Sequence, residues 1–209
     1  RGLRVPGREV SPRISVVLPA YRAEATLGAA IASILAQTEP DFELIIVDDG
    51  MGGLAARAAD LDPRIRVVSF ATNRGIVQAL NAGLEAARGE LIARMDADDL
   101  AHPERLAKQR AFLDARPELG LVGCLVAHAG DTGGQVETVG DASGLEKNAP
   151  DTRGYALYVD WLNGLVTPEA IALGAFVESP FAHPSVMFRR SLVEAHGGTL
   201  SLISEPGEG

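Results

Sequence analysis

Three carboxylates stand within four residues in the segment Asp96-Ala97-Asp98-Asp99. The apolar run before them ends at Met95 and predicts a buried strand. Carboxylates this close repel one another, and burying them without a partner is very costly. Their oxygens suit hard divalent cations such as Mg²⁺ and Mn²⁺, and such a cation can hold a diphosphate. The alternative is a solvated acidic loop that caps a helix beginning near Pro103.

A second acidic pair follows another apolar run, in Asp48-Asp49-Gly50. Asp and Gly favour turns, so one interpretation is a plain turn. An Asp at the end of such a strand can also accept hydrogen bonds from a base or a ribose. Further along, we expect Asn73 to cap a helix, while the guanidinium of Arg74 is suited to a phosphate.

Apolar runs alternate with segments of helical periodicity through residues 14–127. This alternation predicts an α/β fold with a mostly parallel sheet and helices on both of its faces. Parallel strands would bring Pro19-Ala20-Tyr21 and the two acidic segments to one edge of the sheet. The predicted strands are 14–18, 43–47, 64–70, 89–95 and 119–127, and the predicted helices are 25–37, 54–61, 74–88 and about 103–116.

The second part of the chain begins with a stretch rich in Gly, Asp, Thr and Ser, residues 130–153, which predicts a loop. Helical spacing follows over residues 155–165. Thr167 is placed to cap a helix that runs to about Leu173. A short strand at 186–188 and a brief helix at 191–195 complete this part.

Composition places the chain among globular proteins, with 209 residues, 46% hydrophobic and 22% charged. The formal net charge of −9 argues against a nucleic-acid partner, which needs a basic face. The single cysteine, Cys124, excludes an internal disulfide framework, and we expect it to be a buried core residue. No apolar run approaches the roughly 20 residues that span a bilayer, and no signal peptide is visible.

Seven blocks of this sequence, in this order, resemble the family 2 glycosyltransferases, which are inverting enzymes of the GT-A (Rossmann-like) fold. The resemblance extends over residues 14–198 and implies transfer of a sugar from a nucleotide-diphospho-sugar to an acceptor hydroxyl. The blocks are residues 14–22, 33–38, 42–50, 73–75, 79–83, 96–99 and 103–106.

The resemblance also implies roles for individual residues at the nucleotide. The segment Pro19, Ala20 and Tyr21 would line the nucleotide pocket. Asp49, with Asp48 beside it, would contact the nucleobase or the ribose, and Arg74 would lie near the diphosphate. The donor would be a UDP- or GDP-sugar.

The acidic segment would supply the D-x-D motif of the family, formed by Asp96, Ala97 and Asp98. The resemblance makes Asp98 the principal ligand of a divalent Mn or Mg ion, with Asp96 in support. Asp99 is then expected to cap the following helix. His183 matches a segment that the family places on the acceptor side of the site.

The sequence departs from the family pattern after Gly197-Gly198. The family usually places its catalytic base, an Asp in a Glu-Asp pair, shortly after this glycine pair, and residues 199–209 contain no such pair. Glu205 and Glu208 stand among Pro and Gly, which is typical of an irregular tail. We therefore expect a truncated or altered C-terminus, an unknown catalytic base, and a chain that binds its donor but transfers sugar poorly or not at all.

Two other classes of protein are alternatives to the transferase. One is a nucleotide-sugar-binding GT-A domain that is catalytically impaired because the base is missing. The other is a phosphoryl-transfer or receiver-type domain, which needs an Asp at the end of the first strand or a Lys on a later one. Here the first strand ends in Pro19-Ala20-Tyr21, and residues 119–127 contain no Lys, so this class is disfavoured.

We expect the chain to divide into an N-terminal arm and two functional halves. The acceptor is unknown, and a role in cell-wall or polysaccharide biosynthesis is expected. The expected location is cytoplasmic, with contact at the inner face of the membrane as the alternative for the basic arm. The segments are the arm 1–13, a nucleotide-sugar-binding half 14–127, a loop 128–154, an acceptor-side half 155–198 and an irregular tail 199–209.

Overall fold

The computed structural model describes residues 11–53, 55–127 and 152–195. The chain divides into two compact units, one formed by residues 1–122 and 186–209 and the other by residues 123–185. The predictions for the arm before residue 11, for the loop 128–151, and for Gly197-Gly198 with the tail lie outside the described residues. The proposed division into a donor half and an acceptor half is functional and stays a prediction.

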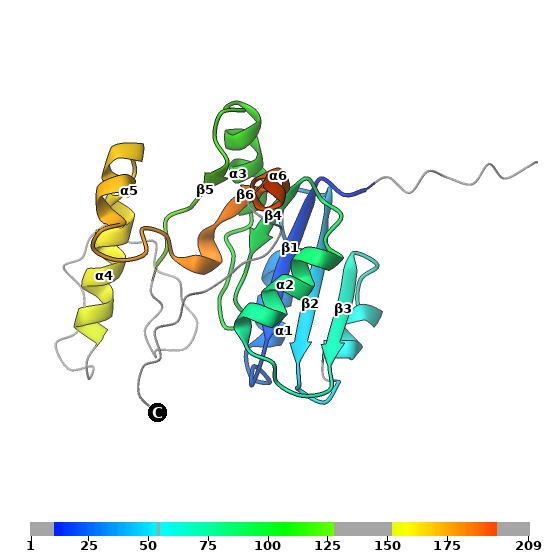
Figure 1. The fold of residues 1–209 in the computed structure, drawn as a ribbon. Helices are drawn as coiled ribbons and strands as arrows, with labels where there is room; N and C mark the ends of the chain where they lie inside the picture. The colour runs from blue at the N-terminus through cyan, green and yellow to red at the C-terminus, as the bar shows by residue number, and fades with distance from the viewer. Residues whose placement is uncertain (1–10, 54, 128–151, 196–209) are drawn as a thin grey trace, which may run out of the picture. The chain divides into compact units, whose positions relative to one another are not determined.

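A six-stranded sheet with the order β3-β2-β1-β4-β6-β5 forms the first unit (Figure 1). Four neighbouring strands are parallel, and β6 is antiparallel to both β4 and β5, which confirms the mostly parallel sheet. The strands are β1 (Ile14–Ala20), β2 (Phe42–Asp49), β3 (Ile65–Phe70), β4 (Leu91–Arg94), β5 (Leu121–Val122) and β6 (Met187–Arg189).

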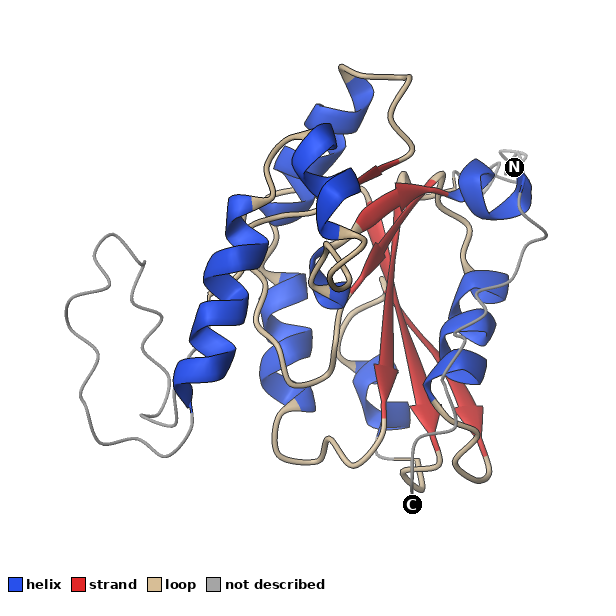
Figure 2. Ribbon diagram, turned by 60° about the vertical axis from the view of Figure 1, so that its left-hand side comes forward, coloured by secondary structure: helices blue, strands red, loops and turns tan. Residues whose placement is uncertain are grey.

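Helices cover both faces of this sheet (Figure 2). On one face, Val16 and Leu18 of β1 pack against α1 (Leu27–Leu35) and α3 (Arg105–Asp114). On the other face, Val17 packs with Leu80 of α2 (Ile76–Ala86). Every residue of β1 and β2 is therefore buried. Burial on both faces is the reason that these strands are continuous apolar runs in the sequence.

Two predicted elements of the first unit are present but differ from the prediction in length or in type. The strand expected at 119–127 is only Leu121–Val122, because its partner β6 is three residues long and pairs with just these two positions. Cys124, just beyond it, is exposed instead of buried. The helix expected at 54–61 is the 3₁₀ helix η1 (Ala55–Asp60). A period of three places Ala55 and Ala58 on one side, and these two are the buried residues of η1.

The second unit contains α4 (Thr152–Gly164), α5 (Pro168–Gly174) and the 3₁₀ helix η3 (His183–Ser185). The predicted cap is confirmed, since the Thr167 side chain accepts a hydrogen bond from the Ala170 N–H. The last helix, α6 (Arg190–Ala195), belongs to the first unit. Among the helices that the structure describes, none has the length and apolar character needed to cross a bilayer.

A buried carboxylate, Glu43, stabilises the edge of the sheet opposite the acidic segments. Its side chain is 3% exposed. It accepts hydrogen bonds from the Ser15 hydroxyl at 2.7 Å, the Arg88 N–H at 2.8 Å and the Arg66 guanidinium at 3.0 Å. Burial raises the pKa of Glu43, but the hydrogen bonds from Ser15, Arg88 and Arg66 outweigh it, so the pKa is lowered.

This lowered pKa makes the stability of the fold depend on pH. The ionised Glu43 stabilises the folded chain above the pKa of the unfolded chain, and this contribution is lost as the pH falls through the folded pKa. We expect Glu43→Gln to lower the free energy of unfolding at pH 7 by about 3 kcal/mol. Urea titrations at neutral and acidic pH should show this difference shrinking in acid. Glu85→Gln, at an exposed position of α2, is the control, and a Glu43→Gln deficit that is constant with pH would contradict the argument.

Candidate active site

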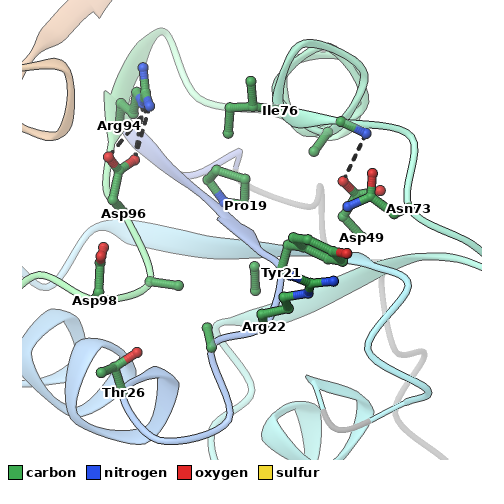
Figure 3. A pocket seen from close by; sticks show the side chains of 15 residues that line it. Pro19, Tyr21, Arg22, Thr26, Asp49, Asn73, Ile76, Arg94, Asp96 and Asp98 are labelled. Atoms are coloured by element: carbon green, nitrogen blue, oxygen red, sulfur yellow. Dashed lines mark hydrogen bonds and ion pairs between the residues drawn. The ribbon is translucent and has the colours of Figure 1, made fainter. Parts of the chain in front are cut away.

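A pocket of about 470 Å³ lies at the carboxyl ends of β1, β2 and β4. The strand order reverses here, because β1 has β2 on one side and β4 on the other. Ligands of open α/β sheets bind at this kind of switch point. The lining residues, all in the first unit, are Pro19, Ala20, Tyr21, Arg22, Ala23, Thr26, Asp49, Asn73, Gly75, Ile76, Ala79, Arg94, Asp96, Ala97 and Asp98 (Figure 3).

Most of the residues expected at the nucleotide and the metal line this pocket. Of the residues that were expected at the nucleotide or the metal, Asp48 and Arg74 lie outside the lining. The Asp48 carboxylate accepts hydrogen bonds from the Met51 N–H at 2.6 Å and the Gly53 N–H at 3.3 Å, so it closes the turn after β2. The Arg74 guanidinium lies 4.5 Å from the centre of the Phe70 ring. The residues in the lining are Pro19, Ala20, Tyr21, Asp49, Asp96, Ala97 and Asp98.

The end of β1 presents an aromatic ring and a strained arginine to the pocket. Tyr21 is 46% exposed, and the Arg22 guanidinium lies 5.1 Å from the centre of its ring. Arg22 has a φ of 52°, a left-handed conformation that costs a side chain about 1 kcal/mol or more. Such strain concentrates at functional sites, and here it places the side chain of Arg22 in the pocket lining.

Asp49 orders the loop on the opposite side of the pocket (Figure 3). Its carboxylate, 2% exposed, accepts hydrogen bonds from the Arg74 N–H at 2.6 Å and the Gly75 N–H at 3.0 Å. The expectation that Asn73 caps α2 is wrong, since Gly75 is the N-cap and makes no side-chain cap. Asp49 supplies acceptors for the N–H groups that precede the helix, and Asn73 lines the pocket instead.

The acidic segment lies across the pocket from Asp49 and Asn73, with Tyr21 and Arg22 between them (Figure 3). Asp98 is exposed, and no hydrogen bond or ion pair to its carboxylate occurs among the residues that the structure describes. The two side chains Asp96 and Asp98 therefore differ, because Asp96 is paired with the guanidinium of Arg94 at 3.1 Å.

Asp99 shows the cost of gathering these charges. Its pKa is raised to about 6. Burial is the largest cause, and the charges of Asp96 and Asp98 add to it, while the guanidiniums of Arg105 and Arg94 oppose the rise. The expectation that Asp99 caps α3 is wrong, because the N-cap is Glu104 and it makes no side-chain cap. The segment thus carries more negative charge than its neighbours neutralise.

Comparison with known proteins decides the family. The family model described as glycosyl transferase family 2 matches residues 15–197. The chain belongs to this family. Its fold is the GT-A fold, as the resemblance implied. The match covers both units, the pocket and the segment that contains His183.

Individual relatives match about half of this family 2 chain. It is 39% identical to the putative glycosyltransferase EpsE of Bacillus subtilis over 117 residues, which cover 54% of this chain and 42% of EpsE. It is 39% identical to the succinoglycan biosynthesis protein ExoO of Rhizobium meliloti over 112 residues, 53% of this chain and 32% of ExoO. The matches thus span less than half the length of these relatives.

A solved structure extends the likeness over nearly the whole chain. The mannosyltransferase PcManGT of Pyrobaculum calidifontis, in complex with GDP-Man and Mn²⁺, superposes with a TM-score of 0.59. The two chains are 25% identical, and the match covers 91% of this chain and 48% of PcManGT.

The sequence interpretation of this family 2 chain missed Arg22 and Arg94. Both line the pocket and are the cations that the described lining contains. The signal for Arg94 was its spacing, since residues two apart on an extended segment lie on one side, which suits an ion pair with Asp96. Arg22 gave no comparable signal, because its position depends on a backbone conformation that few arginines adopt.

His183 lies in the second unit, at the start of η3. It is exposed, and its Nε2 lies 3.4 Å from the Ser179 hydroxyl. Its role on the acceptor side stays a prediction.

Proposed function

We propose that the pocket binds a nucleotide-diphospho-sugar and that the protein transfers the sugar to an acceptor hydroxyl with inversion. The observation that carries this proposal is the exposed Asp98 carboxylate, without a partner among the described residues, in a pocket at the switch point of the sheet. Thr26, the N-cap of α1, and Ile76, the first residue of α2, also line the pocket, and helix N-termini favour anions such as phosphates.

A divalent Mn or Mg ion fits the donor set of this pocket. Hard cations take carboxylate oxygens, and the pKa of Asp99 is raised by its burial and then by the neighbouring charges of Asp96 and Asp98. Asp98 would be the principal ligand and Asp96 the second. No group of three or more His, Cys, Asp or Glu side chains suited to a metal occurs among the described residues, so phosphates and water would supply the other ligands. The bound ion would stabilise the charge of the leaving diphosphate.

The protein's own residues then divide the donor between them. Asp49 and Asn73 form the side of the pocket suited to the base or ribose, with the exposed ring of Tyr21 beside it. Arg94 and Arg22 supply positive charge for the diphosphate. The likeness of the chain to PcManGT, which holds GDP-Man and Mn²⁺, supports the binding of a nucleotide-sugar and a metal.

The proposed reaction is a single displacement. The acceptor oxygen forms a bond to the anomeric carbon as the bond from that carbon to the diphosphate oxygen breaks, which inverts the configuration. The proton of the hydroxyl passes to a general base. We leave the base unassigned, because the segment after Gly197-Gly198 lies outside the described residues. The name of ExoO supports polysaccharide biosynthesis as the setting, and the cytoplasmic location stays a prediction from the sequence.

Thermal unfolding with nucleotides tests the donor site. We expect UDP or GDP with Mn²⁺ to raise Tm, since a ligand at 100 times its Kd stabilises a fold by about 2.7 kcal/mol. Uridine and guanosine at the same concentrations are the controls, because they lack the diphosphate. If neither diphosphate shifts Tm, the proposed donor site is wrong.

The alternative, a binding module with impaired catalysis, is separated by chemistry. Donor hydrolysis and sugar transfer are measured on the same preparation. Nucleotide stabilisation without either reaction would favour the binding module over the transferase.

A further inference from the structure

Arg105, the first residue of α3, is a buried cation outside the lining of the pocket, with 7% of its surface exposed. It belongs to the block 103–106, one of the seven blocks that resemble the family, but the resemblance implied no role for Arg105. Burying a guanidinium is costly unless its N–H groups are bonded. The acceptors that it contacts therefore indicate what the side chain does.

One acceptor is the Gln109 side-chain carbonyl, 3.1 Å from the Arg105 Nε on the same helix, and two others are backbone carbonyls next to the acidic segment and β6. The Nη2 of Arg105 donates to the Arg94 carbonyl at 2.8 Å and to the Val186 carbonyl at 3.4 Å. Its Nη1 lies 3.5 Å from the sulfur of Met95. The Val186 carbonyl also accepts the Arg94 N–H at 3.0 Å. One guanidinium thus joins Arg94, the last residue of β4, to Val186, the residue before β6. Arg94 lies two residues before Asp96.

The far end of the same segment is fixed by Gln37. Its side-chain carbonyl accepts the Leu106 N–H at 2.9 Å, and its amide donates to the His102 carbonyl at 2.8 Å. The Thr38 N–H donates to the Pro103 carbonyl at 2.8 Å. The start of α3 is therefore attached to the end of α1. Between these two attachments lie residues 96–101, which include both proposed metal ligands.

We infer that Arg105 is a positioning residue that sets the Asp96–Asp98 carboxylates for the diphosphate and its metal, an inference that rests on the proposed function. Arg105 does not line the pocket, so it acts through the Arg94 carbonyl and the Met95 side chain. Tyr21 follows β1 and Asp49 ends β2, so both belong to other parts of the sheet than this attachment. Loss of Arg105 should therefore weaken the metal-dependent part of nucleotide binding and spare the part made by the base and ribose.

Arg189 provides a matched control. Its guanidinium also anchors backbone, donating to the Leu119 carbonyl at 2.9 Å, the Leu113 carbonyl at 2.8 Å and the Arg116 carbonyl at 3.3 Å. It lies outside the lining of the pocket. Arg105→Met and Arg189→Met both remove such an anchor, so both should lower Tm.

The experiment measures calorimetric affinities of the whole chain for UDP and GDP with Mn²⁺, and for UMP and GMP without metal. We expect Arg105→Met to reduce the gain in affinity that Mn²⁺ gives to the diphosphate by about 10- to 100-fold, as removing a residue that orients metal ligands does. Its monophosphate affinity should stay as in the wild type. Arg189→Met should leave both affinities unchanged, and Arg105→Lys, which keeps the charge with one nitrogen, should fall between wild type and Arg105→Met.

The other outcomes separate the inference from the proposed function. An unchanged Mn²⁺ gain in Arg105→Met, or equal losses for diphosphate and monophosphate, would overturn the positioning role while the wild type still binds. Equal losses in Arg105→Met and Arg189→Met would do the same. If Arg105→Met does not fold, Arg105→Lys decides, since a wild-type Mn²⁺ gain there would overturn the role. A wild-type chain that binds none of these nucleotides overturns the proposed function and this inference with it.

Discussion

Asp98→Asn is expected to abolish the Mn²⁺-dependent binding of UDP or GDP and to lower sugar transfer about 10³-fold, because a metal at a leaving group supplies several kcal/mol. The side chain keeps its shape but loses the charge that would hold the cation. Asp98 is exposed and makes no hydrogen bond or ion pair in the described part of the chain. Its replacement should therefore leave Tm unchanged or slightly raised, since one repulsive neighbour of Asp99 is removed.

Asp99→Asn is the matched control for this loss. It removes the same unit of charge one residue away, from a side chain outside the lining of the pocket. We expect its Mn²⁺-dependent affinity to stay within about tenfold of the wild type, because Asp99 would act on the ion only through charge at a distance and not as a ligand. Calorimetry with and without Mn²⁺ measures both variants. Equal losses in the two variants would mean that net charge, and not a ligand at Asp98, determines binding, and the metal site would be wrong.

The strands and their order along the chain were predictable because they are buried on both faces. The apolar runs of β1 and β2 need no alternation, and the helices between them carry one apolar face. Parallel pairing then fixes which ends of the strands meet. This is why Tyr21, Asp49 and Asp98 were expected at one edge and do line one pocket.

The contacts that order the pocket were not predictable from local sequence. Asp49 accepts hydrogen bonds from the N–H groups before α2, which lie 25 and 26 residues away in the chain. Capping preferences consider only neighbouring residues, so they predicted Asn73 instead. Arg105 reaches Val186 across 81 residues. The short β5 depends on the length of β6, which follows it by more than 60 residues in the chain. Such pairings follow from the packed fold, and periodicity along the chain does not report them.

Gly50 shows how one of these distant contacts shapes the site. It follows Asp49 with a φ of 90°, and a Cβ at this position would lie 2.6 Å from the Asn73 N and 2.8 Å from the Thr72 carbonyl carbon. The turn after β2 therefore touches the backbone of the loop before α2. The sequence predicted a turn here, and the structure adds that its glycine is what allows Asn73 to approach.

Gly50→Ala is expected to lower the free energy of unfolding by about 4 kcal/mol, from the left-handed φ and from overlap with backbone that cannot rotate away. Gly52→Ala is the matched control, because Gly52 has a φ of 71° and nothing lies within 4 Å of its Cβ position. It should cost only about 1 kcal/mol.

Nucleotide affinity distinguishes the two glycines further. Gly50→Ala should displace Asn73 from the lining of the pocket, so it should weaken the binding of UMP and GMP as well as that of the diphosphates. Asp98→Asn differs, because it acts through the metal. Urea unfolding and calorimetry on both variants measure these effects. If Gly50→Ala costs no more than Gly52→Ala, the close approach of the two loops does not determine the pocket, and the backbone strain alone accounts for the glycine.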